Sequence, residues 1–193
     1  MAGLRQRKKA AAMRNIQRQA VALFREHGFD QVTVDQVAEA SEVSPSTVYR
    51  YFGTKEGLVL HDEYDAVILD VLQERLQAGS SFLRAVSEAL EAIGQGHFVD
   101  ERDETMYRME LWLGHRGVQA AAAVYLNEVT EQVAELLAGA GQGSKAEARF
   151  IAAATINGFI AAIQSWYVEG AVRPAADYVQ EGLAALARLL ADA

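Results

Sequence analysis

A run of hydrogen-bonding side chains stands between residues 44 and 50, where Ser44, Ser46, Thr47, Tyr49 and Arg50 lie close together. Hydroxyl groups at a helix start suit phosphate oxygens, and exposed phenol or guanidinium groups suit base edges in a major groove. The chemistry that this run predicts is binding to double-stranded DNA. The alternative is an ordinary polar surface, because many surface helices expose Tyr and Arg.

Two short helices joined by a turn must hold these side chains. The spacing of Thr33-Val-Asp-Gln36 is that of a capping box, which predicts a helix start. Ser44 is a good N-cap and Pro45 suits the first helical position, which predicts a second helix over 45–51. Val48 and Phe52 share one face of that helix and are predicted to be buried. The arrangement is a helix-turn-helix.

A basic segment and a longer helix precede this motif. Apolar spacing predicts a helix over 10–27 that ends at Gly28. The first nine residues carry four cations, Arg5, Arg7, Lys8 and Lys9. They form either a disordered, solubilising terminus or an arm that follows phosphates or enters a minor groove. Arg7 and Thr33 are included among the predicted DNA-binding residues.

The charge of the chain is unevenly spread. Residues 1–60 hold nine Lys or Arg and six Asp or Glu, a net charge of +3, whereas residues 61–193 hold nine and twenty, a net charge of -11. Only the N-terminal third therefore has a charge balance that suits a polyanion.

The same region resembles the DNA-binding domain of the TetR family of transcriptional regulators. The resemblance is carried by Ile16, Ala20, Phe24, His27-Gly28-Phe29, Thr33-Val34, Val37-Ala38 and the specific stretch Val43-Ser44-x2-Thr47-Val48-Tyr49-Arg50-Tyr51-Phe52-x2-Lys55-Glu56. It implies that Ser44, Thr47, Tyr49 and Tyr51 face DNA, that Lys55 reaches a phosphate, and that Phe24, Val37, Val48 and Phe52 are core. Glu42 replaces the usual Gly of the turn, which costs about 1 kcal/mol if that residue has a positive φ.

Helical patterns continue to the end of the chain. Six further helices are predicted, over 55–76, 81–93, 102–113, 118–137, 145–168 and 174–190, with Gly-containing breaks between them. The nine helices match the count of the family and predict an all-α, TetR-like fold. We expect a DNA-binding domain over 1–54 and a ligand-binding and dimerisation domain over 55–193.

The last two predicted helices have faces suited to a partner. Ala154, Gly158, Ala161, Ala162 and Ser165 form a small-residue face, opposite Ile156, Phe159, Ile163 and Trp166. The final helix has an apolar seam of Val179, Leu183, Leu186 and Leu190. These faces either pack within one chain or form a homodimer, as the family does. Residues 150–168 are uncharged, but their polar members favour an interface helix of a cytoplasmic protein over a membrane span.

A ligand cavity is predicted in the second domain. Met and aromatic side chains make adaptable apolar walls, and the candidates are Met106, Tyr107, Met109, Trp112, Phe159 and Trp166. Asn157 and Gln164 supply polar recognition or hydrogen-bond across a dimer. Each of these is otherwise ordinary core. Residues 47–70 also resemble a TetR subgroup that responds to long acyl-CoA molecules.

Several other functions lack the residues they need. The chain has no Cys, which excludes disulfides, thiolate nucleophiles and Cys-based zinc sites. The glycine-rich run at 139–143 follows a helix, so it lacks the context of a phosphate-binding loop. We expect no enzyme activity, cofactor or metal. The prediction is a repressor released from a palindromic operator by an apolar effector; the alternatives are a helical enzyme or carrier for an apolar substrate and a DNA-packaging protein.

Overall fold

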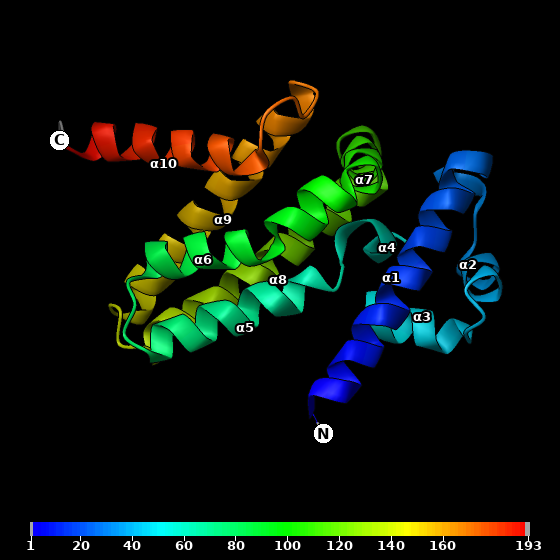
Figure 1. Cartoon of the computed structure of the whole chain (residues 1–193), viewed down its shortest axis with the longest axis horizontal. Helices are drawn as coiled ribbons and strands as arrows, with labels where there is room; N and C mark the ends of the chain where they lie inside the picture. The colour runs from blue at the N-terminus through cyan, green and yellow to red at the C-terminus, as the bar shows by residue number, and fades with distance from the viewer. Residues whose placement is uncertain (1, 192–193) are drawn as a thin grey trace. The chain divides into compact units, whose positions relative to one another are not determined.

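The computed structural model is helical throughout the residues it describes, 2–191, with side chains described for 4–185 and 188. Its elements are α1 (Ala2–His27), η1 (Phe29–Gln31), α2 (Val34–Ala40), α3 (Pro45–Phe52), α4 (Gly57–Leu60), α5 (Tyr64–Gln77), α6 (Phe82–Gln95), η2 (Gly96–Asp100), α7 (Arg102–Gly114), α8 (Arg116–Gly139), α9 (Lys145–Val168) and α10 (Ala175–Ala191), as Figure 1 shows. The predicted all-α fold is confirmed.

The helices form two compact units. The first comprises the chain up to residue 65 together with 103–125, and the second comprises 66–102 and the chain from 126 onward. In the first unit α1, α2, α3 and α4 enclose a core that includes Ile16, Phe24, Val37, Val48, Phe52 and Leu58. The core of the second unit includes Leu72, Leu76, Phe82, Ala89, Leu137 and Ala152. The functional boundary between residues 54 and 55 stays a prediction.

The prediction of one helix over 55–76 is wrong. The chain leaves the helical conformation after α4, and α5 restarts at Tyr64. Asp62 explains the restart, because its Oδ1 accepts from the Tyr64 amide at 2.9 Å and its own amide donates to Asp65 Oδ2 at 3.2 Å. This reciprocal pair resembles a capping box with Asp in both positions. The described residues therefore contain ten α-helices instead of nine.

The N-terminal basic segment is also helical. α1 begins at Ala2, so the cations before residue 10 extend this helix instead of forming an irregular arm. Ala, Leu, Arg, Gln and Lys are strong helix formers, which accounts for the continuation.

Among the described residues, α9 is the helix whose length and composition would allow it to cross a membrane. Its most apolar window is only 22% buried within the chain. An apolar helix that is this exposed in a single chain is expected to be covered by something outside that chain. The sequence analysis predicts that a second copy of the chain covers it.

Candidate DNA-binding surface and ligand cavity

The turn motif has the local geometry that the sequence predicts. Thr33 Oγ1 accepts from the Gln36 amide at 3.2 Å, and Gln36 Oε1 accepts from the Thr33 amide at 2.8 Å. The capping box at the start of α2 is therefore confirmed. Between α2 and α3, Glu42 has a φ of 57°, in the left-handed region. A side chain at such a position costs about 1 kcal/mol or more relative to Gly, so the turn is strained by its own sequence.

The start of α3 carries a cluster of hydroxyl groups. Ser44 is the N-cap, as predicted, and its Oγ accepts from the Thr47 amide at 3.2 Å. Its hydroxyl also lies 2.8 Å from the Ser46 hydroxyl and 2.9 Å from that of Thr47. Pro45 occupies the first turn, where its missing N–H leaves no donor unused. A cluster of hydroxyl groups at a helix start forms a surface that suits a phosphate oxygen.

Two buried residues fix the orientation of α3. Val48 and Phe52 are 1% and 2% exposed, and both lie in the core of the first unit. Tyr49, by contrast, is 52% exposed, and Arg50 is exposed beside it. Tyr51 is half-buried, and its ring is flanked by the Arg50 guanidinium at 4.9 Å and by Lys9 Nζ at 5.9 Å. The predicted outward side chains of α3 therefore share one polar, cationic surface.

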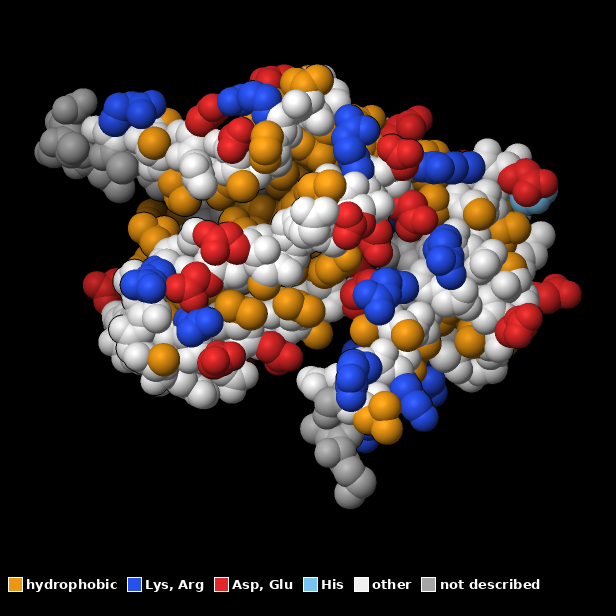
Figure 2. Space-filling model, viewed as in Figure 1, with side chains coloured by type: hydrophobic (Ala, Val, Ile, Leu, Met, Phe, Trp, Pro, Cys, Tyr) orange, Lys and Arg blue, Asp and Glu red, His pale blue; other side chains and the backbone are white. Residues whose placement is uncertain are grey.

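The basic end of α1 borders this surface through Lys9. Arg5, Lys8 and Lys9 fall on one side of the helix by the 3.6-residue repeat, and Arg7 falls on another. All four side chains are exposed. Figure 2 shows Lys and Arg side chains gathered along the N-terminal half of α1. The Arg5, Lys8 and Lys9 stripe thus extends the positive surface beyond α3.

Lys55 is more constrained than the sequence indicates. Its Nζ donates to the carbonyl oxygens of Phe29 at 2.9 Å and Val32 at 3.1 Å, and it lies 3.4 Å from that of Asp30. The ammonium also stands 4.5 Å from the centre of the Phe29 ring. In this structure Lys55 holds the η1 turn, and its predicted phosphate contact stays a prediction.

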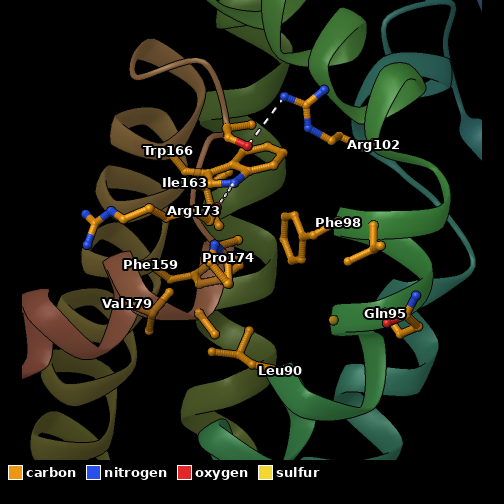
Figure 3. Close-up of a pocket in the computed structure, with 15 residues that line it drawn as sticks. Leu90, Gln95, Phe98, Arg102, Phe159, Ile163, Trp166, Arg173, Pro174 and Val179 are labelled. Carbon is orange, nitrogen blue, oxygen red and sulfur yellow. Dashed lines mark hydrogen bonds between the residues drawn. The ribbon is translucent and has the colours of Figure 1, made fainter.

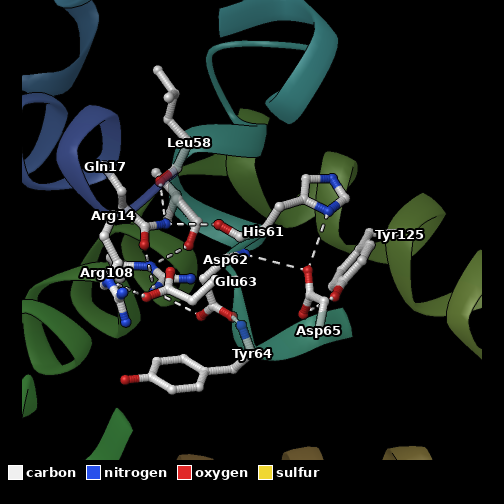
Figure 4. Close-up of polar contacts among 11 residues, drawn as sticks. Arg14, Gln17, Leu58, His61, Asp62, Glu63, Tyr64, Asp65, Arg108 and Tyr125 are labelled. Atoms are coloured by element: carbon white, nitrogen blue, oxygen red, sulfur yellow. Dashed lines mark hydrogen bonds and ion pairs between the residues drawn. The ribbon is translucent and has the colours of Figure 1, made fainter. Parts of the chain in front are cut away.

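A buried polar cluster in the first unit was not predicted (Figure 4). Gln17 is 6% exposed, and its Nε2 donates to the carbonyls of Leu58 at 3.0 Å and His61 at 2.7 Å. Arg108 Nη1 donates to Gln17 Oε1 at 3.3 Å and pairs with Asp62 at 3.0 Å. The Gln17–Arg108–Asp62 cluster therefore ties α1 and α7 to the segment that ends α4.

A second polar group extends this cluster. Tyr125 Oη donates to Asp65 Oδ1 at 2.7 Å, and the Tyr125 ring packs edge-on against His61 at 4.4 Å. Burial, and then the Asp65 carboxylate, raise the pKa of Tyr125 well above its usual range. The Tyr125 phenol therefore stays protonated at neutral pH, where it can donate to Asp65.

A cavity of about 380 Å³ lies in the second unit (Figure 3), which confirms the prediction of a void of about 300 Å³ or more. Its walls come from α6, η2, the first residue of α7, α9, α10 and the α9–α10 linker, and include Leu90, Gly94, Phe98, Val99, Arg102, Phe159, Ile163, Trp166, Ala171, Pro174 and Val179. The π-helical turn η2 places Phe98 against Trp166, with ring centres 5.4 Å apart.

Of the predicted ligand-binding residues, the structure brings only Phe159 and Trp166 to this cavity. Met106, Met109 and Trp112 belong to the first unit; Met109 is buried there, and Trp112 packs against its core. Asn157 is exposed and donates to the Ala153 carbonyl within α9, and Gln164 is not among the lining residues. For this cavity the prediction is corrected, because helical spacing does not show which apolar cluster a helix joins.

The α9–α10 linker closes one side of the cavity. α9 ends in a Schellman motif, in which the amides of Gly170 and Ala171 donate to the carbonyls of Tyr167 and Trp166. Gly170 and Ala171 both have positive φ, 77° and 55°. Arg102 Nη2 donates to the Gly170 carbonyl at 2.8 Å and holds the linker against the start of α7.

The two predicted faces of α9 are present with one exception. Ala154, Gly158, Ala161 and Ser165 are exposed, whereas Ile163 and Trp166 are buried. Ala162, predicted on the small-residue face, is 8% exposed and lies on the buried side instead. A Cβ added at Gly158 would meet no atom within 4 Å in this chain. On α10, Leu183 is 36% exposed, whereas Val179 is buried and lines the cavity. The side chains of Leu186 and Leu190 lie outside the described residues.

The fold and these surfaces define a helix-turn-helix protein with a helical body that contains a partly open cavity. The chain belongs to the TetR family of bacterial regulatory proteins, which its sequence resembles. Residues 16–61 match the family described as bacterial regulatory proteins, tetR family. Residues 80–191, more than half of the chain, match the family described as MftR C-terminal domain.

Comparison with individual proteins agrees with this assignment. The chain is 40% identical over 93 residues to the HTH-type transcriptional regulator TcmR of Streptomyces glaucescens, a match that covers 47% of this chain and 41% of that protein. The matched segment thus spans about two-fifths of the length of that relative.

Solved structures share the fold at low identity. Thermus thermophilus FadR, a TetR-family repressor in complex with lauroyl-CoA, has a TM-score of 0.58 and 21% identity over 89% of this chain and 91% of that one. NalD of Pseudomonas aeruginosa, the secondary repressor of the MexAB-OprM multidrug efflux pump, has a TM-score of 0.53 and 19% identity over 93% and 96%.

Proposed function

We propose that this chain is a dimeric transcriptional repressor that binds a palindromic operator and is released from it by an apolar small molecule. The observation that carries the proposal is the orientation of α3. Buried Val48 and Phe52 leave Tyr49 and the hydroxyl cluster facing outward on a helix short enough to enter a major groove. The proposed DNA contacts are Thr33, Ser44, Ser46, Thr47, Tyr49, Arg50, Tyr51 and Lys55, with Arg7 from α1.

The proposed homodimer forms through α9 and α10. The exposed small-residue face of α9 allows close approach of another helix, and the open space at Gly158 leaves room for it. Apolar residues at its ends, Phe150 and Val168, are 76% and 75% exposed and are further candidates for contact. A homodimer would carry two copies of α3, one for each half of a palindromic site.

Release follows from differential binding. Two recognition helices must meet major-groove faces about 34–36 Å apart, or a further helical repeat apart. An effector that binds more tightly when the two α3 helices are wrongly spaced will shift the population away from the DNA-bound form. The cavity in the second unit is the proposed effector site. The resemblance over residues 47–70 suggests acyl-CoA as one effector class.

The test is selection of bound DNA from a random duplex pool, followed by sequencing. We expect enrichment of a palindrome with half-sites separated by one helical turn or a multiple of it. Failure to enrich any sequence, or enrichment of a site without two-fold symmetry, would contradict the proposal. Binding of all sequences with equal affinity would instead indicate a DNA-packaging protein.

A further inference from the structure

The cavity in the second unit has walls that are almost entirely apolar and aromatic. Phe98 and Trp166 meet edge-to-face, with planes inclined at 78°, and Phe159 also lines the cavity (Figure 3). Trp166 is 1% exposed, whereas Phe98 and Phe159 are half-buried, so these two rings supply the aromatic surface that another flat molecule can reach. No Asp or Glu lines this cavity in the part of the chain that the structure describes.

The polar groups that border the cavity are already engaged within the chain. The Trp166 indole donates to the Arg173 carbonyl at 3.0 Å, and Gln95 Nε2 donates to Asp100 Oδ1 at 2.8 Å. The Arg102 guanidinium bonds the Gly170 carbonyl, as described above. The Arg173 guanidinium is held by both carboxylate oxygens of Glu181. Each of these polar groups therefore already has a partner within the chain.

We infer that this cavity binds an uncharged aromatic molecule, recognised by ring stacking and shape. An ionised group moved from water into these walls loses its hydration without gaining an unengaged counter-charge. A neutral ring system loses little hydration and gains contacts with Phe98, Phe159 and Trp166. The claim that this molecule is the effector rests on the proposed function. The claim that the cavity binds such a molecule does not depend on DNA binding.

The same argument applies to an acyl-CoA molecule. Its nucleotide portion carries several phosphate charges, and the walls of this 380 Å³ cavity offer them no unengaged partner. An acyl chain alone would find apolar walls, but the CoA portion would have to stay outside. We therefore expect a whole acyl-CoA to bind this cavity poorly compared with a neutral aromatic compound, and for this cavity the aromatic class replaces the acyl-CoA class that the resemblance suggests.

The test is isothermal titration calorimetry of the full chain with three compounds of matched shape: 4-butylphenol, 4-butylbenzoate and 4-butylbenzylammonium. At pH 7 the phenol is uncharged, because its pKa is about 10. We expect the phenol to bind about tenfold or more tightly than either ion. Equal or tighter binding of either ion, or no binding of the phenol, would overturn the inference. Dodecanoyl-CoA is included, and tight binding of it within this cavity would also overturn it.

A cavity-filling variant locates the binding. Gly94 lines the cavity, and a Cβ added to it meets no atom within 4 Å, so Gly94→Leu adds bulk where space exists. Leu is also the better helix former, so α6 should not lose stability. We expect Gly94→Leu to weaken phenol binding about tenfold or more, and the control Gly139→Leu, remote from the cavity walls, to leave it unchanged. Unchanged binding in Gly94→Leu would overturn the inference.

Failure of the inference is separable from failure of the proposed function. DNA selection with the unliganded protein tests the regulator without any compound. If no DNA is selected, the proposed function fails and the calorimetric result still stands. If a palindrome is selected but the charged compounds bind best, the regulator stands and the inferred ligand class is wrong.

Discussion

Tyr49 combines exposure with a position fixed by its buried neighbours. It is the most exposed aromatic side chain on α3, and the phenol offers a ring for a thymine methyl and a hydroxyl for a base edge or phosphate. Tyr49 is exposed, and the neighbouring Val48 is the residue that packs in the core. Removing the Tyr49 ring should therefore leave the fold intact.

We expect Tyr49→Ala to weaken binding to the selected palindrome by about 1–3 kcal/mol. Binding to unrelated duplexes should change much less, because phosphate contacts carry no sequence information. Fluorescence anisotropy at matched salt measures both affinities, and circular dichroism checks the fold. A variant that binds the palindrome as tightly as the parent would rule out this role for Tyr49.

Glu42 stands where the family usually has Gly, and this difference affects stability. Its φ of 57° is a conformation that Gly adopts without strain. We expect Glu42→Gly to raise the free energy of unfolding by up to about 1 kcal/mol, measured by urea denaturation. Glu39→Gly in the last turn of α2 is the control and should lower it, because Gly is a poor helix former. A loss of stability in Glu42→Gly would show that the turn is unstrained.

Arg108 is a residue of the first unit whose loss should be costly. It is paired with Asp62 at exposures of 11% and 7%, so Arg108→Met removes the cation that faces a buried carboxylate. We expect a destabilisation of about 3–5 kcal/mol in urea denaturation. Adding Asp62→Asn should recover part of the loss, because the amide oxygen can still cap α5 and carries no charge. A double variant no more stable than Arg108→Met alone would contradict this account.

At the scale of elements, sequence analysis predicts those features that depend on residues close together in the chain. The caps Thr33 and Ser44 bond groups three residues away, and both were predicted. The contacts of Gln17 lie 41 and 44 residues away, and those of Lys55 lie 23 to 26 residues away, beyond any local pattern. The split between α4 and α5 did have a local signal, the spacing of two Asp residues, which sequence analysis missed. The cavity walls depend on long-range packing. Of the ligand-binding residues predicted from the sequence, only Phe159 and Trp166 therefore line the cavity.

The helical extension of α1 gives a prediction at this scale. We expect the triple variant Arg5→Ala, Lys8→Ala and Lys9→Ala to bind all duplexes more weakly. The reason is that the three cations it lacks would contact DNA phosphates in the parent protein. The slope of log affinity against log salt should fall by about two to three units, near 0.9 per phosphate contact. Ala keeps the helix. Arg149→Ala, on α9 and paired with Glu131, is the control. An unchanged slope in the triple variant would mean that this stripe does not touch DNA.

At the scale of the whole molecule, the exposed face of α9 is the proposed centre of the dimer. Gly158 tests it directly, because a Leu side chain there finds open space within its own chain. We expect Gly158→Leu to give monomers or aggregates by light scattering, since the added side chain would separate the facing helices. The control Gly139→Leu should remain dimeric. An intact Gly158→Leu dimer would place the interface elsewhere.

The place of Trp166 gives the protein an optical property. The chain has two tryptophans, and Trp166 is 1% exposed yet lines the cavity beside Phe98. We expect a molecule that binds against this wall of the cavity to change the surroundings of the indole, and therefore its emission. With the other tryptophan replaced by Phe (Trp112→Phe), the remaining fluorescence would come from the cavity wall alone. The protein thus carries a built-in reporter, and occupancy of the cavity could be followed in solution without a label.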